Sequence, residues 1–171
     1  MDDRNSAGAP GAQASRARIL EGLAANYPEV QYHFVQFVSE HLADCARVFR
    51  GDMEKLLILA VLGQRYIEGA RIDRTAADLD TARVWMSTLR LADVTGLPRE
   101  TVRRKLKAME AEGWLRQERG RGWTLAGEIR QTVVREQLGE LDRRGLERLA
   151  RLLAALRPFL PEGATPPTPA R

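Results

Sequence analysis

The sequence predicts a mostly helical fold with one small β-hairpin, and three patterns support this prediction. Apolar residues recur at helical spacing over 27–68 and again over 128–160. Between these stretches, residues 87–127 are predicted to form two short helices, a tight turn between them, and then two short strands. The chain has 171 residues, of which 44% are apolar, so it is long enough to build one sizeable core.

Composition narrows the classes of partner and compartment. The formal net charge is +4 and the isoelectric point about 9.7, which favours acidic partners such as nucleic acid if the charge is concentrated in one place. No run of 18 apolar residues occurs and the N-terminal residues lack a signal pattern, so we expect a cytoplasmic protein without membrane insertion. The one cysteine, Cys45, excludes an internal disulfide and a cysteine-type zinc site.

Both ends of the chain are predicted to be flexible tails, over residues 1–26 and 161–171. The N-terminal tail begins with an Ala- and Gly-rich stretch without apolar periodicity, and the C-terminal tail carries four prolines. A connection over 69–86 stays unassigned because three aspartates interrupt its pattern, namely Asp73, Asp78 and Asp80.

The N-terminal helices are predicted over 27–68. A long amphipathic helix begins near Tyr27 and ends near Gly51, a residue suited to a helix C-terminus. Its apolar stripe contains Val30, Phe34, Phe37, Val38, His41 and Val48. Asp52 is a good N-cap for a second helix, which is apolar around most of its circumference and is therefore expected to be buried.

The C-terminal helices are predicted over 128–160, with a first helix over Glu128–Gln137. A coiled-coil-like stripe then follows, made of Leu138, Leu141, Gly145, Leu149, Leu152 and Leu156. Leu146 and Leu153 widen this stripe beyond what one partner helix needs, so we expect the terminal helices to form a homodimer. The alternative is that the stripe packs only against the first long helix of its own chain.

The segment 87–127 carries the functional prediction, and it starts with a short helix. Ser87 or Thr88 caps this helix, and Gly96 supplies the permissive backbone that a sharp turn requires. Its inward positions are predicted to be Leu91, Ala92 and Val94.

A second helix is predicted to start at Pro98, whose fixed backbone angle suits a first helical turn. Val102, Leu106 and Met109 lie at i, i+4 and i+7 and form its inward stripe. Charged residues must then point away or lie at the flank, and these are Arg99, Glu100, Arg103, Arg104, Lys105 and Lys107. The helix combines an apolar back with a basic front.

Gly113 ends this helix, and a hairpin follows. Its strands are predicted at Trp114–Leu115 and at Trp123–Leu125, with the turn Arg119-Gly120-Arg121-Gly122 between them. We expect both tryptophans to be core residues rather than stacking platforms for bases. A helix that fits the major groove, followed by a basic hairpin, is what a winged helix-turn-helix reader of double-stranded DNA requires.

Roles within this segment follow from side-chain chemistry. Arg99 or Arg104 suits guanine O6 and N7, and Glu100 suits cytosine N4, although Glu100 also has an alternative role as a helix-dipole partner. Lysines and hairpin arginines suit phosphates. The predicted DNA-binding residues are Thr88, Arg99, Glu100, Thr101, Arg103, Arg104, Lys105, Lys107, Arg119 and Arg121.

The segment GLPRETVRRKLKAMEAEGWL resembles the recognition helix of the cyclic-AMP receptor and fumarate-nitrate regulator family. The resemblance implies that Arg99, Glu100 and Arg104 contact base edges and that Thr101 supports the helix N-terminus or a phosphate. Pro98 replaces the hydroxyl residue usual in that family. Nothing upstream resembles its Gly-rich nucleotide-binding β-roll, so a nucleotide-sensing role is not implied.

The whole-chain order of elements is similar to the MarR family. That similarity implies a dimer joined by its first and last helices, with recognition helices in successive major grooves. It implies a palindromic operator with half-sites about one helical turn apart. An effector ligand is conceivable by the same similarity, but no residue of the sequence identifies one.

Other readings of the sequence remain open or weak. His33, Phe37, His41 and Cys45 share one helical stripe, which we interpret as packing rather than as a metal or ligand site because no third strong ligand accompanies them. No nucleophile–base pair or phosphate loop is present, so we predict no enzyme, no cofactor and no metal. Two alternatives to a transcription regulator are a winged-helix protein-interaction module and a replication initiator that binds repeated origin sites.

Overall fold

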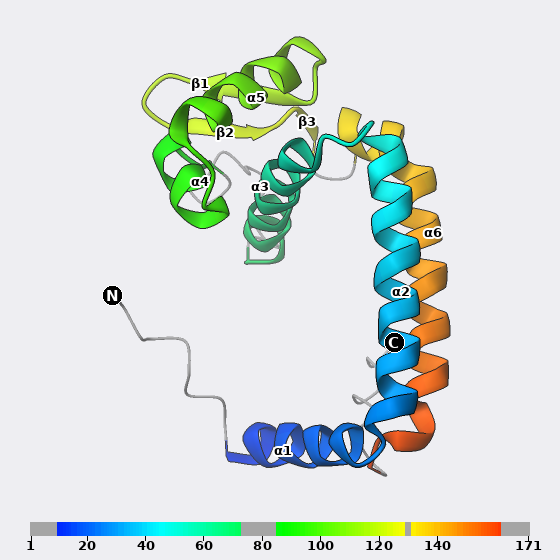
Figure 1. Ribbon diagram of the computed structural model, residues 1–171. Coiled ribbons are helices and arrows are strands. Elements are labelled where there is room, and N and C mark those ends of the chain that lie inside the picture. Colours follow the sequence, from blue (N-terminus) through cyan, green and yellow to red (C-terminus); the bar gives the residue numbers. More distant parts are fainter. Residues whose placement is uncertain (1–9, 73–84, 129–130, 162–171) are drawn as a thin grey trace. The chain divides into compact units, whose positions relative to one another are not determined.

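A computed structural model describes residues 10–72, 85–128 and 131–161 (Figure 1). The described chain is mostly helical, with two small antiparallel sheets of two strands each. It divides into two compact units. The central unit is Ala43–Arg143, and the terminal unit contains the described residues before and after it.

The terminal unit is built from helices alone. It contains α1 (Pro10–Ala25), most of α2 (Tyr27–Val48), the second half of α6 (Val133–Leu156) and the 3-10 helix η1 (Arg157–Phe159). Within it α2 and α6 run side by side and antiparallel (Figure 1). None of its described residues is fully buried.

The helix α1 corrects the prediction of a flexible tail over 1–26. Residues 10–25 form a helix although they lack apolar periodicity. A tertiary contact explains the difference, because a Cβ at Gly22 would clash with the carbonyl oxygen of Phe159, so the absence of a side chain lets α1 pack against η1. Residues 1–9 and most of the predicted C-terminal tail lie outside the described residues.

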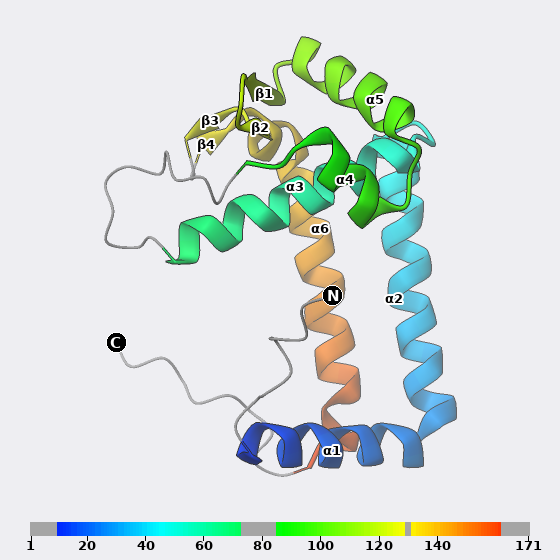
Figure 2. The same cartoon turned by 90° about the vertical axis from the view of Figure 1, so that its left-hand side faces the viewer.

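The central unit holds the hydrophobic core. It contains α3 (Met53–Ile72), α4 (Thr88–Thr95) and α5 (Arg99–Ala111), together with β1 (Leu115–Glu118) and β2 (Gly122–Leu125) (Figure 2). The last turn of α2 and the first turns of α6 complete it. Its largest fully buried apolar side chains come from four of these elements: Ile58, Leu62, Leu91, Val102, Leu106, Met109 and Trp123.

The helix α3 begins as predicted, because the Asp52 carboxylate accepts a hydrogen bond of 3.0 Å from the backbone N–H of Lys55. The expectation that this helix is buried all round is wrong. Ile58 and Leu62 are inaccessible to solvent, but Met53 and Leu57 are exposed. Its apolar circumference is therefore covered on one face only within the described chain. Most of the unassigned connection, residues 73–84, lies outside the described residues, and Trp85 and Met86 after it are buried.

The start of the C-terminal region also differs from the prediction. Two short strands, β3 (Gly127–Glu128) and β4 (Gln131–Thr132), stand where a helix was expected to begin, and one continuous helix, α6, then starts at Val133. Thr132 explains this start, because its hydroxyl oxygen accepts a hydrogen bond from the backbone N–H of Arg135 at 3.2 Å.

Candidate nucleic-acid interface

The turn between α4 and α5 is formed by the residues that the sequence indicated. Ser87 is the N-cap of α4, and its hydroxyl oxygen accepts from the Arg90 N–H at 3.1 Å. Gly96 ends α4 in the left-handed conformation at φ 69°, which a residue without a Cβ adopts most easily. Pro98 is the residue before the first helical residue of α5 rather than within it. Leu91 is buried as predicted, but Val94 is exposed and not inward-facing.

The helix α5 has a buried face and an exposed face. Val102, Leu106 and Met109 are inaccessible to solvent, which confirms the predicted inward stripe. At about 100° per residue, Arg104 lies opposite that stripe. Two of the exposed side chains beside it, Ala108 and Ala111, are small, and Glu100 and Lys107 lie one turn away from it. The centre of the exposed face therefore presents a guanidinium with little bulk on the side of the two alanines.

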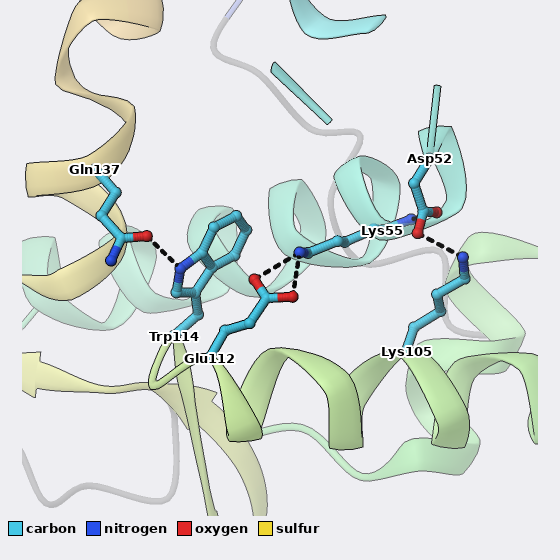
Figure 3. Close-up of polar contacts among 6 residues, drawn as sticks. All are labelled: Asp52, Lys55, Lys105, Glu112, Trp114 and Gln137. Carbon is cyan, nitrogen blue, oxygen red and sulfur yellow. Dashed lines mark hydrogen bonds and ion pairs between the residues drawn. The ribbon is translucent and has the colours of Figure 1, made fainter. Parts of the chain in front are cut away.

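Two ion pairs fix α5 to the first turn of α3 (Figure 3). Lys105 Nζ lies 2.6 Å from an Asp52 carboxylate oxygen, and Lys55 Nζ lies 2.7 Å from Glu112 at the other end of α5. Burial raises the pKa of Asp52, but the hydrogen bonds from Lys105 and from the Lys55 backbone outweigh it and leave this pKa below its usual value. We call these two contacts the α3–α5 ion pairs.

The α3–α5 ion pairs change the interpretation of Lys105. Its side chain is only 17% exposed and also lies 3.5 Å from Glu54. We predicted a phosphate contact, but Lys105 instead lies at the flank of α5 and holds the helix in place. No local pattern indicates this role, because Asp52 and Lys105 are 53 residues apart.

Trp114 is a core residue as predicted, and it joins several elements. Its ring packs edge-on against Phe49 with centroids 6.1 Å apart, and Lys55 Nζ lies 4.1 Å from its centroid. Its indole N–H donates to the Gln137 side-chain oxygen at 2.6 Å (Figure 3). The end of α5 is therefore held by apolar and polar contacts together.

Glu100 and Arg103 form a bidentate pair on the exposed surface of α5. Two guanidinium nitrogens of Arg103 lie 2.8 and 2.6 Å from the two Glu100 oxygens. The hydrogen bond from Arg103 lowers the pKa of Glu100 below its usual value. Arg103 therefore holds the Glu100 carboxylate in a defined orientation, beside Arg104.

The β1–β2 hairpin pairs Leu115 with Leu125 and Glu118 with Gly122, so its loop is shorter by one residue than predicted. Met86 adds a third backbone segment, because it exchanges two backbone hydrogen bonds with Trp123, at 2.9 and 2.8 Å. A Cβ at Gly122 would clash with the Met86 carbonyl oxygen, which explains the glycine there. Trp123 is buried as predicted.

Two side chains tie the hairpin to the helices. The Trp123 indole N–H donates to the Thr88 hydroxyl at 3.1 Å, so this predicted DNA-binding residue makes a structural contact. Lys107 Nζ donates to Gln117 on β1 at 3.0 Å and to Glu110 at 2.8 Å, and it lies 5.1 Å from the Trp123 centroid. These contacts hold the hairpin against α4 and α5.

The hairpin arginines differ in how they are engaged. Arg121 lies 3.3 Å from Glu118, and Arg116 stacks 5.0 Å from the Trp85 ring centroid. Arg99, Arg104 and Arg119 are exposed and make no ion pair with the described residues. We call these three residues the unpaired arginines. Thr101 is half-buried at the start of α5.

The stripe of His33, Phe37, His41 and Cys45 contains a packing contact. The Phe37 and His41 rings stack with centroids 5.9 Å apart and an interplanar angle of 4°. Cys45 is buried in the core cluster of the central unit. The described residues contain no group of three or more His, Cys, Asp or Glu side chains placed to hold a metal ion.

Comparisons of the chain with protein-family models, with curated proteins and with solved structures found no match. Among the described helices, none has the length and apolar character needed to cross a membrane.

Proposed function

We propose that the chain is a transcription regulator that binds double-stranded DNA as a homodimer, through a winged helix-turn-helix formed by α3, α4, α5 and the β1–β2 hairpin. The observation that carries the proposal is the exposed face of α5, where Arg104 projects opposite a buried apolar stripe and has Ala108 and Ala111 among its exposed neighbours. A helix of this kind fits the major groove, and small neighbours allow the guanidinium to reach base edges.

Charge distribution supports the same proposal. Residues 98–122 contain eight basic and four acidic side chains, a surplus of four positive charges that equals the net charge of the whole chain. The rest of the chain is therefore neutral on balance. Such a concentration around one helix and one hairpin attracts phosphates, and it makes affinity fall steeply as salt rises.

The proposed roles follow from the engagement of each side chain. Arg104 and Arg99 are candidates for base contacts, with Glu100 held by Arg103 as an acceptor for cytosine N4. Arg119 at the hairpin tip and Lys107 at the hairpin side of α5 are candidates for phosphates. Lys105 and Thr88 act as supports rather than as contacts.

The homodimer is proposed from the exposed surface of the terminal unit. Large apolar side chains are exposed on both long helices: Phe34, Val35 and Leu42 on α2, and Leu146, Leu149 and Leu153 on α6. Helix geometry places these two stripes on the same side of the antiparallel pair. We call this surface the apolar face. A surface of this kind is best covered by another copy of itself, which also fits a palindromic operator.

The experiment is selection of random duplex DNA by the purified protein, followed by titration of the enriched sequence across salt. The Arg104→Ala variant is expected to lose about 1–3 kcal/mol of cognate binding and to relax base preference, because a base contact is removed. Arg119→Ala is expected to weaken cognate and scrambled duplex equally and to reduce the salt slope by about one.

Arg65→Ala is the matched control, because Arg65 is a partly exposed arginine of α3 that pairs with Glu68 of the same helix. It should leave DNA affinity unchanged. Several cations of the region already have acidic partners, among them Arg103, Lys107 and Arg121. If no sequence is enriched and binding to all duplexes is weak, the surface serves protein contacts instead.

A further inference from the structure

Trp114 lies where several segments meet at the end of α5. It follows the Glu112 C-cap by two residues, and its backbone N–H donates to the Met109 carbonyl at 2.9 Å. Its own carbonyl accepts from the backbone N–H of Ala126, the residue after β2, also at 2.9 Å. Only 8% of Trp114 is exposed, and a buried indole N–H without an acceptor would be costly. The source of that acceptor is therefore important for the end of α5.

The acceptor comes from α6. The side-chain oxygen of Gln137 lies 2.6 Å from the indole nitrogen of Trp114 (Figure 3). Gln137 lies one turn after Val134 and one turn before Leu141, which are both buried in the core. The stretch of α6 that presents the acceptor is thus anchored on both sides of it. Gln137 itself is exposed, so its amide makes this contact without filling the core.

The indole ring of Trp114 also positions a cation. The Lys55 ammonium lies over the ring, 4.1 Å from its centroid, where the negative face of an aromatic ring attracts a cation. The same ammonium lies 2.7 Å from each carboxylate oxygen of Glu112, and the Lys55 side chain is only 15% exposed. Because the helix dipole disfavours a carboxylate at a helix C-terminus, Glu112 depends on this cation. The orientation of the indole thus affects the ion pair at the end of α5.

From these contacts we propose that Gln137 is a positioning residue for α5. It fixes the indole plane of Trp114, the indole face and Glu112 together fix the Lys55 ammonium, and Lys55 holds the end of α5. The inference rests on the proposed function of α5 in DNA binding. It gives an exposed glutamine of α6, which is not itself a proposed DNA contact, an effect on DNA affinity.

The first test compares the affinity of Gln137→Met and of the natural chain for the enriched duplex. Methionine keeps the length and helix propensity of glutamine but is only a weak acceptor. The net effect of one hydrogen bond on an equilibrium is about two- to tenfold, so the affinity should weaken by about that factor as fewer chains hold α5 in its binding position. Unchanged affinity would contradict the proposal.

Gln64→Met is the matched control. Gln64 is an exposed glutamine of α3 whose side chain hydrogen-bonds to none of the described residues. The substitution is the same, and it also lies in a helix of the central unit. It should leave the affinity unchanged, and a loss equal to that of Gln137→Met would overturn the proposal.

A double-mutant cycle separates positioning from a general loss of stability. In Glu112→Gln the carboxylate that Lys55 holds becomes neutral, so Gln137 has lost the end of its series of contacts. Adding Gln137→Met to this variant should then weaken DNA binding by less than about twofold. If Gln137→Met has the same effect with and without the Glu112 carboxylate, Gln137 does not act through Lys55, and the proposal is wrong.

A nitrogen–proton correlation spectrum of the free chain tests the same contacts without DNA. Gln137→Met should move the indole signal of Trp114 and the backbone amide signals of Lys55 and Glu112, whereas Gln64→Met should move none of them. A change confined to Trp114 would contradict the role of Gln137. Failure of the natural chain to bind any duplex would instead contradict the proposed function, and the spectrum would still show whether Gln137 acts on α5.

Discussion

The central and terminal units place their apolar and charged side chains in opposite ways. In the central unit a cluster of buried apolar side chains forms the core, and ion pairs at its edge hold α3 and α5 together. In the terminal unit none of the described residues is fully buried, large apolar side chains face outward, and charged ones line a cavity. The contrast indicates that the central unit is stabilised by its own core, whereas the exposed apolar surface of the terminal unit supports the proposed homodimer.

The largest effect is expected from a change in the central core. Leu106→Ala should lower the free energy of unfolding by about 2–5 kcal/mol, because it removes a fully buried side chain and leaves a cavity. Denaturant unfolding followed by circular dichroism measures this loss. Leu89→Ala on the exposed side of α4 is the control and should change stability by less than about 0.5 kcal/mol. Similar losses in both variants would contradict the assignment of the core.

A change in the apolar face should act on association instead. Leu153→Ser is expected to weaken the proposed homodimer by about 1.5–3 kcal/mol per subunit, because a leucine that a partner would bury becomes polar. Sedimentation equilibrium measures the dissociation constant. Ile67→Ser is the control, since Ile67 is similarly exposed but lies on α3 of the central unit. An unchanged association state in Leu153→Ser would remove the apolar face as the dimer surface.

The α3–α5 ion pairs connect capping with the position of α5. Asp52→Ala should cost about 1–2 kcal/mol, because it removes the N-cap of α3 and leaves Lys105 without its nearest carboxylate. DNA affinity should fall beyond what the folded fraction explains, since α5 loses a positioning contact. Asp93→Ala, at an exposed position of α4, is the control. Unchanged DNA affinity in fully folded Asp52→Ala would show that this contact does not position α5.

The smallest effect is a pH dependence of the same contact. The pKa of Asp52 is lower in the folded chain than in the unfolded one, so its stabilising effect is present above the unfolded value of about 3.9 and is lost as pH falls through the folded value. Asp52→Asn keeps a good cap but no charge. Its stability deficit relative to the natural chain should be constant from pH 7 to about 5 and should shrink below about pH 4. A deficit that is independent of pH would exclude the ion pair as its cause.

Local signals in the sequence predicted the segment from α4 to the β1–β2 hairpin well. The left-handed Gly96, the inward stripe of α5 and the paired strands around the hairpin all follow from residues within one or two turns of each other. These features depend on backbone preference and on apolar periodicity, both of which are visible in a short window. The burial of Trp114 and Trp123 was predicted for the same reason.

Features that depend on distant partners were not predicted. The helix α1 depends on the close approach of Gly22 to η1, and Lys105 was assigned to phosphates because its partner Asp52 is far away in the sequence. Thr88 was predicted to contact DNA, although its hydroxyl accepts a hydrogen bond from Trp123, 35 residues further on. A charged or hydroxyl side chain has no periodicity that reveals which partner it meets, so its role requires the tertiary structure.

Gly122 has a consequence for engineering the hairpin. Its contact with the Met86 backbone makes this position unsuitable for substitution, and Gly120 in the loop has a positive φ of 84°, which side chains other than glycine rarely adopt. Residues 119 and 121 are therefore the loop positions at which charge can be exchanged while the loop length and both glycines are kept, so that the flanking strands keep their register. Libraries built at these two positions would change the proposed DNA affinity of the protein without altering its core.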